Sequence, residues 1–106
     1  MIRSVIRCFV KESSNEVRRN LVSDLLYCLI EKLELVMLFP HTGYFLGRTD
    51  LAVQGSIIET ITKLLGSASF SDQDQTIWIY DDLIIRGWPD KIDDREIFQV
   101  EVSHKI

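Results

Sequence analysis

Strands are predicted where hydrophobic and polar residues alternate along the chain. Over residues 2–11, apolar residues alternate with Arg3, Arg7 and Lys11, and this period of two indicates a strand. The alternation over residues 96–103 is the clearest in the chain and predicts a strand with one apolar face. In that strand Phe98, Val100 and Val102 should face inward, with Ile97, Gln99, Glu101 and Ser103 on the opposite face.

A broad helical stripe follows the first predicted strand. Residues 17–33 carry apolar side chains at spacings of three and four, and the stripe is so broad that protein must cover most of this helix. Ser13 and Glu16 stand three residues apart ahead of it, as a capping box requires. The helix cannot pass Pro40, because a residue before proline avoids the α region. The stripe consists of Val17, Leu21, Val22, Leu25, Leu26, Cys28, Leu29, Ile30 and Leu33.

A second helix is predicted from the apolar spacing of residues 57–65. Thr49 or Asp50 can cap its first turn, and Ser56 offers a later start. Gly66 stands where a helix end needs a left-handed residue. The spacing and these signals outweigh the low helix propensity of the β-branched residues in this stretch.

Two hairpins are predicted between and after the helices. Leu35–Phe39 either extends the first helix or pairs as a strand with Tyr44–Leu46. Thr76–Tyr80 and Leu83–Arg86 flank Asp81 and Asp82, and an Asp pair suits a tight turn between two strands.

Two polar stretches are expected to interrupt the regular elements. Ser67–Gln75 is predicted to be a flexible loop, and Gly87–Asp90 is predicted to end the strand before it. The whole order is β-α-β-β-α-β-β-β. We expect a single α+β domain over residues 1–106, with two helices packed on one face of a mostly antiparallel sheet.

Composition and charge narrow the classes of partner. The 106 residues are 46% hydrophobic and 26% charged with a net charge of -4, so the chain is globular, and nucleic acid or an anionic membrane is an unfavourable partner.

Cys8 and Cys28 have mainly apolar neighbours, which favours buried thiols over a disulfide. No uninterrupted apolar segment is long enough for a secretory signal or a membrane span. These features predict a cytoplasmic protein.

No arrangement of residues indicates catalysis, a metal or a cofactor. His41 and His104 have no metal-ligand spacing and are expected at the surface, and the glycines form no phosphate-binding motif. Residues 79–84 resemble the palm motif of reverse transcriptases, whose aspartates hold magnesium, but that motif has an extra residue before its first acid. We favour a turn at Asp81 and Asp82 over a metal-dependent hydrolase, and we expect a protein that is not an enzyme.

Negative charge is concentrated in the second half of the chain. Residues 1–53 hold seven cations and six acids, whereas residues 54–106 hold ten acids and five cations. Trp78, Tyr80 and Trp88 are interleaved with these acids, although either Trp could instead belong to the core. Carboxylates among large aromatics are typical of a surface that binds a basic protein. The residues predicted to bind this partner are Asp72, Asp74, Asp81, Asp82, Trp88, Asp90, Asp93, Asp94 and Glu96.

In this general character the chain resembles the immunity proteins that bacteria make against nuclease toxins of the colicin and contact-dependent-inhibition type. The resemblance rests on small size, acidity and the aromatics set among the carboxylates of residues 72–101. It implies a cytoplasmic inhibitor that covers the basic active site of a nuclease toxin domain. The alternative is a structural or adaptor module that forms a homodimer through an exposed strand edge such as Glu96–Ser103.

Overall fold

Nine elements make up the part of the chain that the structure describes. The structure is a computed structural model that describes residues 16–39, 42–72 and 74–105. In chain order the elements are α2 (Glu16–Lys32), β1 (Glu34–Phe39), β2 (Tyr44–Asp50), the 3-10 turn η2 (Leu51–Val53), α3 (Gln54–Leu65), β3 (Phe70–Ser71), β4 (Thr76–Tyr80), β5 (Leu83–Ile92) and β6 (Arg95–His104).

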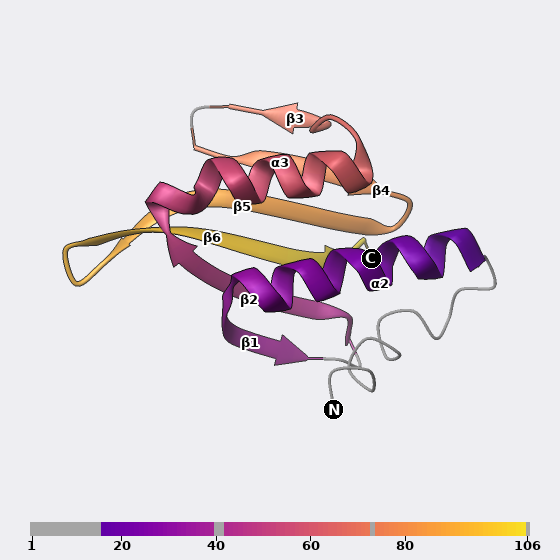
Figure 1. The fold of residues 1–106 in the computed structure, drawn as a ribbon, viewed down its shortest axis with the longest axis horizontal. Helices are drawn as coiled ribbons and strands as arrows, with labels where there is room; N and C mark the ends of the chain where they lie inside the picture. Colours follow the sequence, from indigo (N-terminus) through magenta and orange to yellow (C-terminus); the bar gives the residue numbers. More distant parts are fainter. Residues whose placement is uncertain (1–15, 40–41, 73, 106) are drawn as a thin grey trace.

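The strands form one antiparallel sheet in the order β1-β2-β6-β5-β4-β3. Helices α2 and α3 contact each other and lie across one face of this sheet (Figure 1). The described residues therefore confirm the predicted α+β fold, with two helices on one face of a mostly antiparallel sheet. The strand predicted over residues 2–11 and the cap predicted at Ser13 lie outside the described residues.

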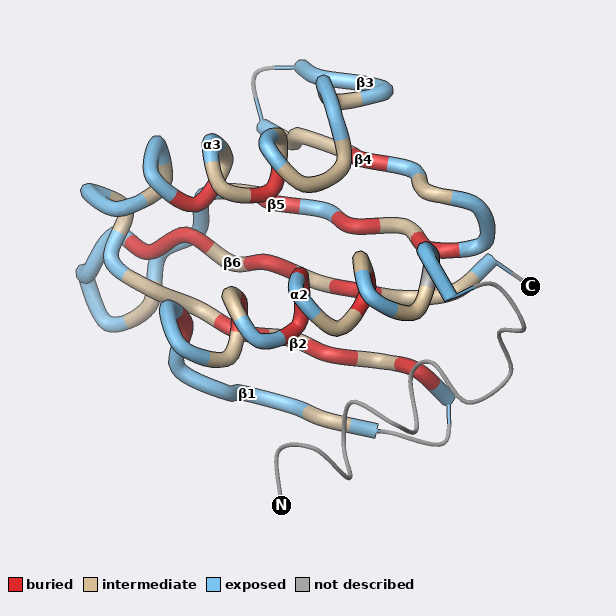
Figure 2. The backbone as a smooth tube through the Cα atoms, turned by 45° about the vertical axis from the view of Figure 1, so that its right-hand side comes forward, coloured by how far each residue is buried: buried red, intermediate tan, exposed pale blue. Residues whose placement is uncertain are grey.

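The hydrophobic core lies between the helices and the sheet. Buried positions on α2, α3 and the strands face one another in Figure 2, as the predicted helical stripes require. One member of the first stripe differs, because Val17 is 73% exposed. The first turn of α2 extends past the strands and has no sheet beneath it (Figure 1). The core cluster is Val22, Leu25, Leu26, Leu29, Leu33, Phe45, Ile57, Ile61, Trp78, Leu83, Ile85, Phe98, Val100 and Val102.

The start of α3 differs from the prediction, whereas its end agrees with it. Thr49 and Asp50 belong to β2, the chain enters α3 through η2, and the N-cap position is Val53, which has no capping side chain. The predicted caps are therefore wrong, because the 3-10 turn leads directly into the helix. Gly66 has a φ of +88°, and its N–H donates to the Thr62 carbonyl at 2.8 Å, as expected of a residue after a helix end.

The first predicted hairpin is confirmed. Leu35–Phe39, for which a helix extension was the alternative, belongs to a strand. Leu38 pairs with Phe45 and Phe39 pairs with Tyr44, with a bulge between Leu35 and Met37. Part of the predicted loop over residues 67–75 is also a strand, because Phe70 and Ser71 form β3 and pair with β4.

Strand β5 continues through the residues that were predicted to end it. A Cβ atom on Gly87 would lie 2.5 Å from Cζ of Phe98, so this glycine admits the ring of a buried residue on β6. Pro89 lies beyond the last residue of β5 that pairs with β4, where the strand is an edge and tolerates proline. Gly87 and Pro89 therefore lie within one continuous strand and do not end it.

Strand β6 is central, between β2 and β5. The proposed dimer edge at residues 96–103 is therefore wrong, because neighbouring strands already occupy both edges over most of that stretch. Phe98, Val100 and Val102 are buried as predicted. Ile97 is also fully buried, although the alternation places it on the face without helices.

Candidate functional site

The β5–β6 hairpin extends past both neighbouring strands. β4 pairs with β5 no further than Gly87, so no described strand lies beside residues 88–92 on that side. β2 pairs with β6 only as far as Ile97, so residues 95 and 96 likewise have no described strand on their outer side. The hairpin projects from one end of the sheet (Figure 1). We call residues 88–97 the arm.

Two aspartates form the tip of the arm. Asp93 and Asp94 connect β5 to β6 with φ angles of 51° and 64°. A two-residue hairpin turn of type I′ requires positive φ at both of these positions. Aspartate tolerates this region better than most residues other than glycine and asparagine. Both residues are exposed, so the tip presents two carboxylates to solvent.

The base of the arm is held by the side chain of Asp90. Its Oδ1 accepts a hydrogen bond from the Lys91 backbone N–H at 2.8 Å, and its Oδ2 accepts one from Nε2 of Gln99 at 2.6 Å. The bond to Gln99 joins β5 to β6 at the base of the arm, and the bond to Lys91 fixes the Asp90 carboxylate against its own strand.

The two tryptophans have different environments. Trp88 is half-buried on the arm, and it pairs in register with Gln99. Alternation places it on the helix-free face as a diagonal neighbour of the buried Ile97. Trp78 is 1% exposed in the core, with Nε1–H 3.4 Å from Oγ1 of Thr62. Of the two, only Trp88 has surface available to a partner.

The β3–β4 turn lies at the same end of the sheet as the arm, because β4 begins opposite Gly87. Oδ1 of Asp72 accepts hydrogen bonds from the backbone N–H groups of Asp74 at 2.8 Å and Gln75 at 2.9 Å. This arrangement is an Asx turn, which leaves the carboxylates of Asp72 and Asp74 exposed.

Six carboxylates lie at this end of the sheet. Within residues 16–39, 42–72 and 74–105, none of them forms a salt bridge. Lys91 and Arg95 are the cations of the arm, which has four acids. The arm therefore has a net negative charge, and its electric field acts on the surrounding solvent and on any approaching molecule. The six acids are Asp72, Asp74, Asp90, Asp93, Asp94 and Glu96.

Asp81 and Asp82 lie at the other end of the sheet, in the β4–β5 turn (Figure 1). The φ of Asp81 is 53°, in agreement with the expected turn. Oδ2 of Asp82 lies 3.3 Å from Nδ1 of His104. The structure therefore separates these two acids from the arm. His104 itself is half-buried, with its ring against Gly43, and so is less exposed than predicted.

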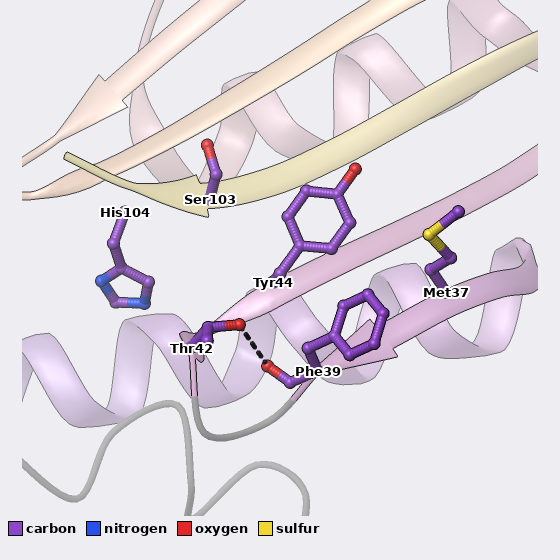
Figure 3. A pocket seen from close by; sticks show the side chains of 6 residues that line it. All are labelled: Met37, Phe39, Thr42, Tyr44, Ser103 and His104. Carbon is purple, nitrogen blue, oxygen red and sulfur yellow. Dashed lines mark hydrogen bonds between the residues drawn. The ribbon is translucent and has the colours of Figure 1, made fainter. Parts of the chain in front are cut away.

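Near this second end, the helix-free face has an open pocket of about 450 Å³. Met37, Phe39 and Tyr44 supply most of its apolar surface (Figure 3). The Tyr44 hydroxyl donates to Oε2 of Glu101 at 2.8 Å, and partial burial together with this carboxylate raises the pKa of Tyr44 to about 12. The phenol is therefore protonated at neutral pH. Sequence reasoning missed this pocket because it depends on the register of β1 against β2.

The pocket does not contain a Ser-His-Asp constellation, although Ser103, His104 and Asp82 are close in the fold. Successive residues of a strand point to opposite sides, and the Ser103 hydroxyl and the His104 ring do so in Figure 3. Nor do three or more His, Cys, Asp or Glu side chains converge as a metal site within the described residues. Cys28 is a free, half-buried thiol, and Cys8 lies outside the described residues.

Comparison with known proteins adds no family assignment. The chain matches no protein-family model, no curated protein and no solved structure with which it was compared. Neither α2 nor α3 is both long and apolar enough to cross a bilayer, and they are the α-helices among the described residues.

Proposed function

We propose that the arm binds a basic protein, and that the chain is a cytoplasmic inhibitor of a nuclease toxin domain. The observation that carries the proposal is the projecting hairpin, whose acids form no ion pairs with the described residues. A nuclease active site is basic because it holds a phosphate backbone. An acidic hairpin that extends beyond the sheet can enter such a cleft where a flat acidic surface cannot.

Electrostatics would act mainly on the rate of association. Exposed charges are screened over about 10 Å at 0.1 M salt, so the arm attracts a partner from further away as salt is lowered. Such steering raises association rates by about 10–1,000-fold. The four acids of the arm and the two of the β3–β4 turn lie at the same end of the sheet, so the negative field is strongest beyond that end.

Trp88 would supply the anchor once the surfaces meet. Trp88 is half-buried and is the diagonal neighbour of the buried Ile97 in the strand register, so part of its surface is already packed before a partner binds. Fixed aromatic side chains lose little conformational entropy on binding and are enriched among the residues that dominate interface energy. The sequence pattern predicted these two roles, with carboxylates that attract the partner and an aromatic ring that anchors it.

The test uses the product of the reading frame that precedes this chain's own as the candidate toxin. Purified product is assayed for cleavage of RNA and DNA with and without this protein. We expect stoichiometric inhibition. If the product cleaves nucleic acid at the same rate with the inhibitor in excess, the proposal is wrong.

A matched pair of variants tests the role of the arm. Asp93→Asn with Asp94→Asn removes two charges from the tip, and asparagine tolerates the same positive φ angles. Asp81→Asn with Asp82→Asn makes the same change in the turn at the opposite end. At low salt we expect the arm variant to inhibit several-fold less well, with little effect of the control. Equal effects of the two variants would show that the arm has no special role.

A further inference from the structure

β1 is an apolar edge strand of the sheet that the described residues form. Among residues 16–39, 42–72 and 74–105, the sheet ends at β1 on one side and at β3 on the other. β3 has two residues, and a short edge strand is a common protection against further pairing. β1 has six residues, and its side chains other than Glu34 are apolar. The exposed fractions are 54% for Leu35, 39% for Val36, 46% for Met37 and 53% for Phe39.

The apolar surface continues from this edge onto the helix-free face. Met37 pairs with Leu46 and Phe39 pairs with Tyr44, so these side chains share that face. The rings of Phe39 and Tyr44 lie with their centroids 6.0 Å apart, at the pocket shown in Figure 3. No other described strand pairs with the outer edge of β1, and such an edge beside an apolar patch is the arrangement to which another strand adds.

We propose that a second copy of this chain covers β1, with the two β1 strands antiparallel about a two-fold axis. The four exposed apolar side chains of each copy would contribute at most about 400 Å², or half of the roughly 800 Å² that each partner buries in a stable interface. The strand backbone and its polar rim would supply the rest. A two-fold contact needs a patch that is complementary to itself, and an apolar strand edge meets this requirement.

Charge also favours a second copy at this edge. Glu34 is the charged residue of β1, and its Oε1 lies 3.3 Å from Nη2 of Arg48. Two copies would therefore meet without unpaired like charges on β1, in spite of the net charge of -4 on each. The arm is at the Glu34 end of β1 (Figure 1), so antiparallel pairing would place the two arms at opposite ends of a continuous sheet.

The test is sedimentation of the full chain over a range of micromolar concentrations, with two matched variants. Phe39→Lys places a charge on β1, and Phe70→Lys makes the same change on β3, where the phenylalanine is 54% exposed. We expect a dimer whose dissociation constant rises by about a hundredfold in Phe39→Lys, because each substitution occurs twice in a two-fold interface. Phe70→Lys should leave the dissociation constant unchanged.

Hydrogen exchange locates the contact independently of the variants. Amides of β1 should exchange more slowly as protein concentration rises, and those of β3 should not change. A monomer at all concentrations, equal effects of the two variants, or exchange in β1 that ignores concentration would overturn the proposal. None of these outcomes depends on whether the arm binds a toxin.

Discussion

Substitution of Gly87 by alanine should destabilise the protein through a single contact. The added Cβ would lie 2.5 Å from Cζ of Phe98, whereas ordinary contacts begin at 3.4 Å, so the ring has to move by about 0.9 Å. Phe98 is 1% exposed and belongs to the core cluster, which leaves the ring no free space. Overpacking of this kind costs about 1–3 kcal/mol.

Gly55 provides a control with the opposite sign. It is exposed in α3, and an added Cβ would meet no atom within 4 Å. Gly55→Ala should therefore raise the free energy of unfolding by about 0.5–1 kcal/mol, since alanine loses less backbone entropy than glycine in a helix. The two variants make the same chemical change, so a difference between them reports the surroundings of each glycine.

Urea unfolding followed by the fluorescence of the buried Trp78 measures both free energies. A second substitution, Phe98→Leu, shortens the side chain over Gly87 and should reduce the penalty of Gly87→Ala by about 1 kcal/mol or more. The reasoning is refuted if Gly87→Ala unfolds with the same free energy as the wild type, or if its penalty is unchanged in the Phe98→Leu background.

Substitutions of Asp94 and Glu101 test the turn geometry and the hydrogen bond of the Tyr44 hydroxyl. Asp94→Gly should keep or raise stability because φ at this position is 64°, whereas Asp94→Val should cost about 1 kcal/mol or more in urea unfolding. Glu101→Gln should lower the pKa of Tyr44 from about 12 toward 10 in a spectrophotometric titration. In the wild type, the stability that Tyr44 contributes should be complete below pH 10 and lost between about pH 10 and 12, since its folded pKa is the higher one. A Tyr44 titration unaffected by Glu101→Gln, or equal stabilities of the two Asp94 variants, would contradict these assignments.

The predicted elements were accurate where periodicity carried the information. Apart from the exposed Val17, the stripes of α2 and α3 and the alternation of β6 are confirmed, because burial on one face imposes them directly. Gly87 and Pro89 led to a wrongly predicted strand end. A glycine can mark the end of a strand or a place where a neighbouring ring packs against the backbone, and a proline occurs both in turns and on strand edges. The central position of β6 was also hidden, since alternation describes the two faces of a strand and not its neighbours.

The candidate site illustrates a further limit of linear charge patterns. Asp81-Asp82 and Asp93-Asp94 are identical pairs twelve residues apart, and a sequence window places them in one acidic cluster. Successive hairpin turns of an antiparallel sheet lie at alternate ends, so the fold separates the two pairs. The acids of the β3–β4 turn share an end with the arm for the same reason.

The rate at which the partner associates, measured by stopped flow as a function of salt, tests the central proposal most directly. We expect the rate for the wild type to fall steeply as salt rises, and the Asp93→Asn, Asp94→Asn variant to associate several-fold more slowly at low salt with a shallower dependence. The Asp81→Asn, Asp82→Asn variant should follow the wild type. Identical salt dependences for all three proteins would contradict a role for the arm in capturing a basic partner.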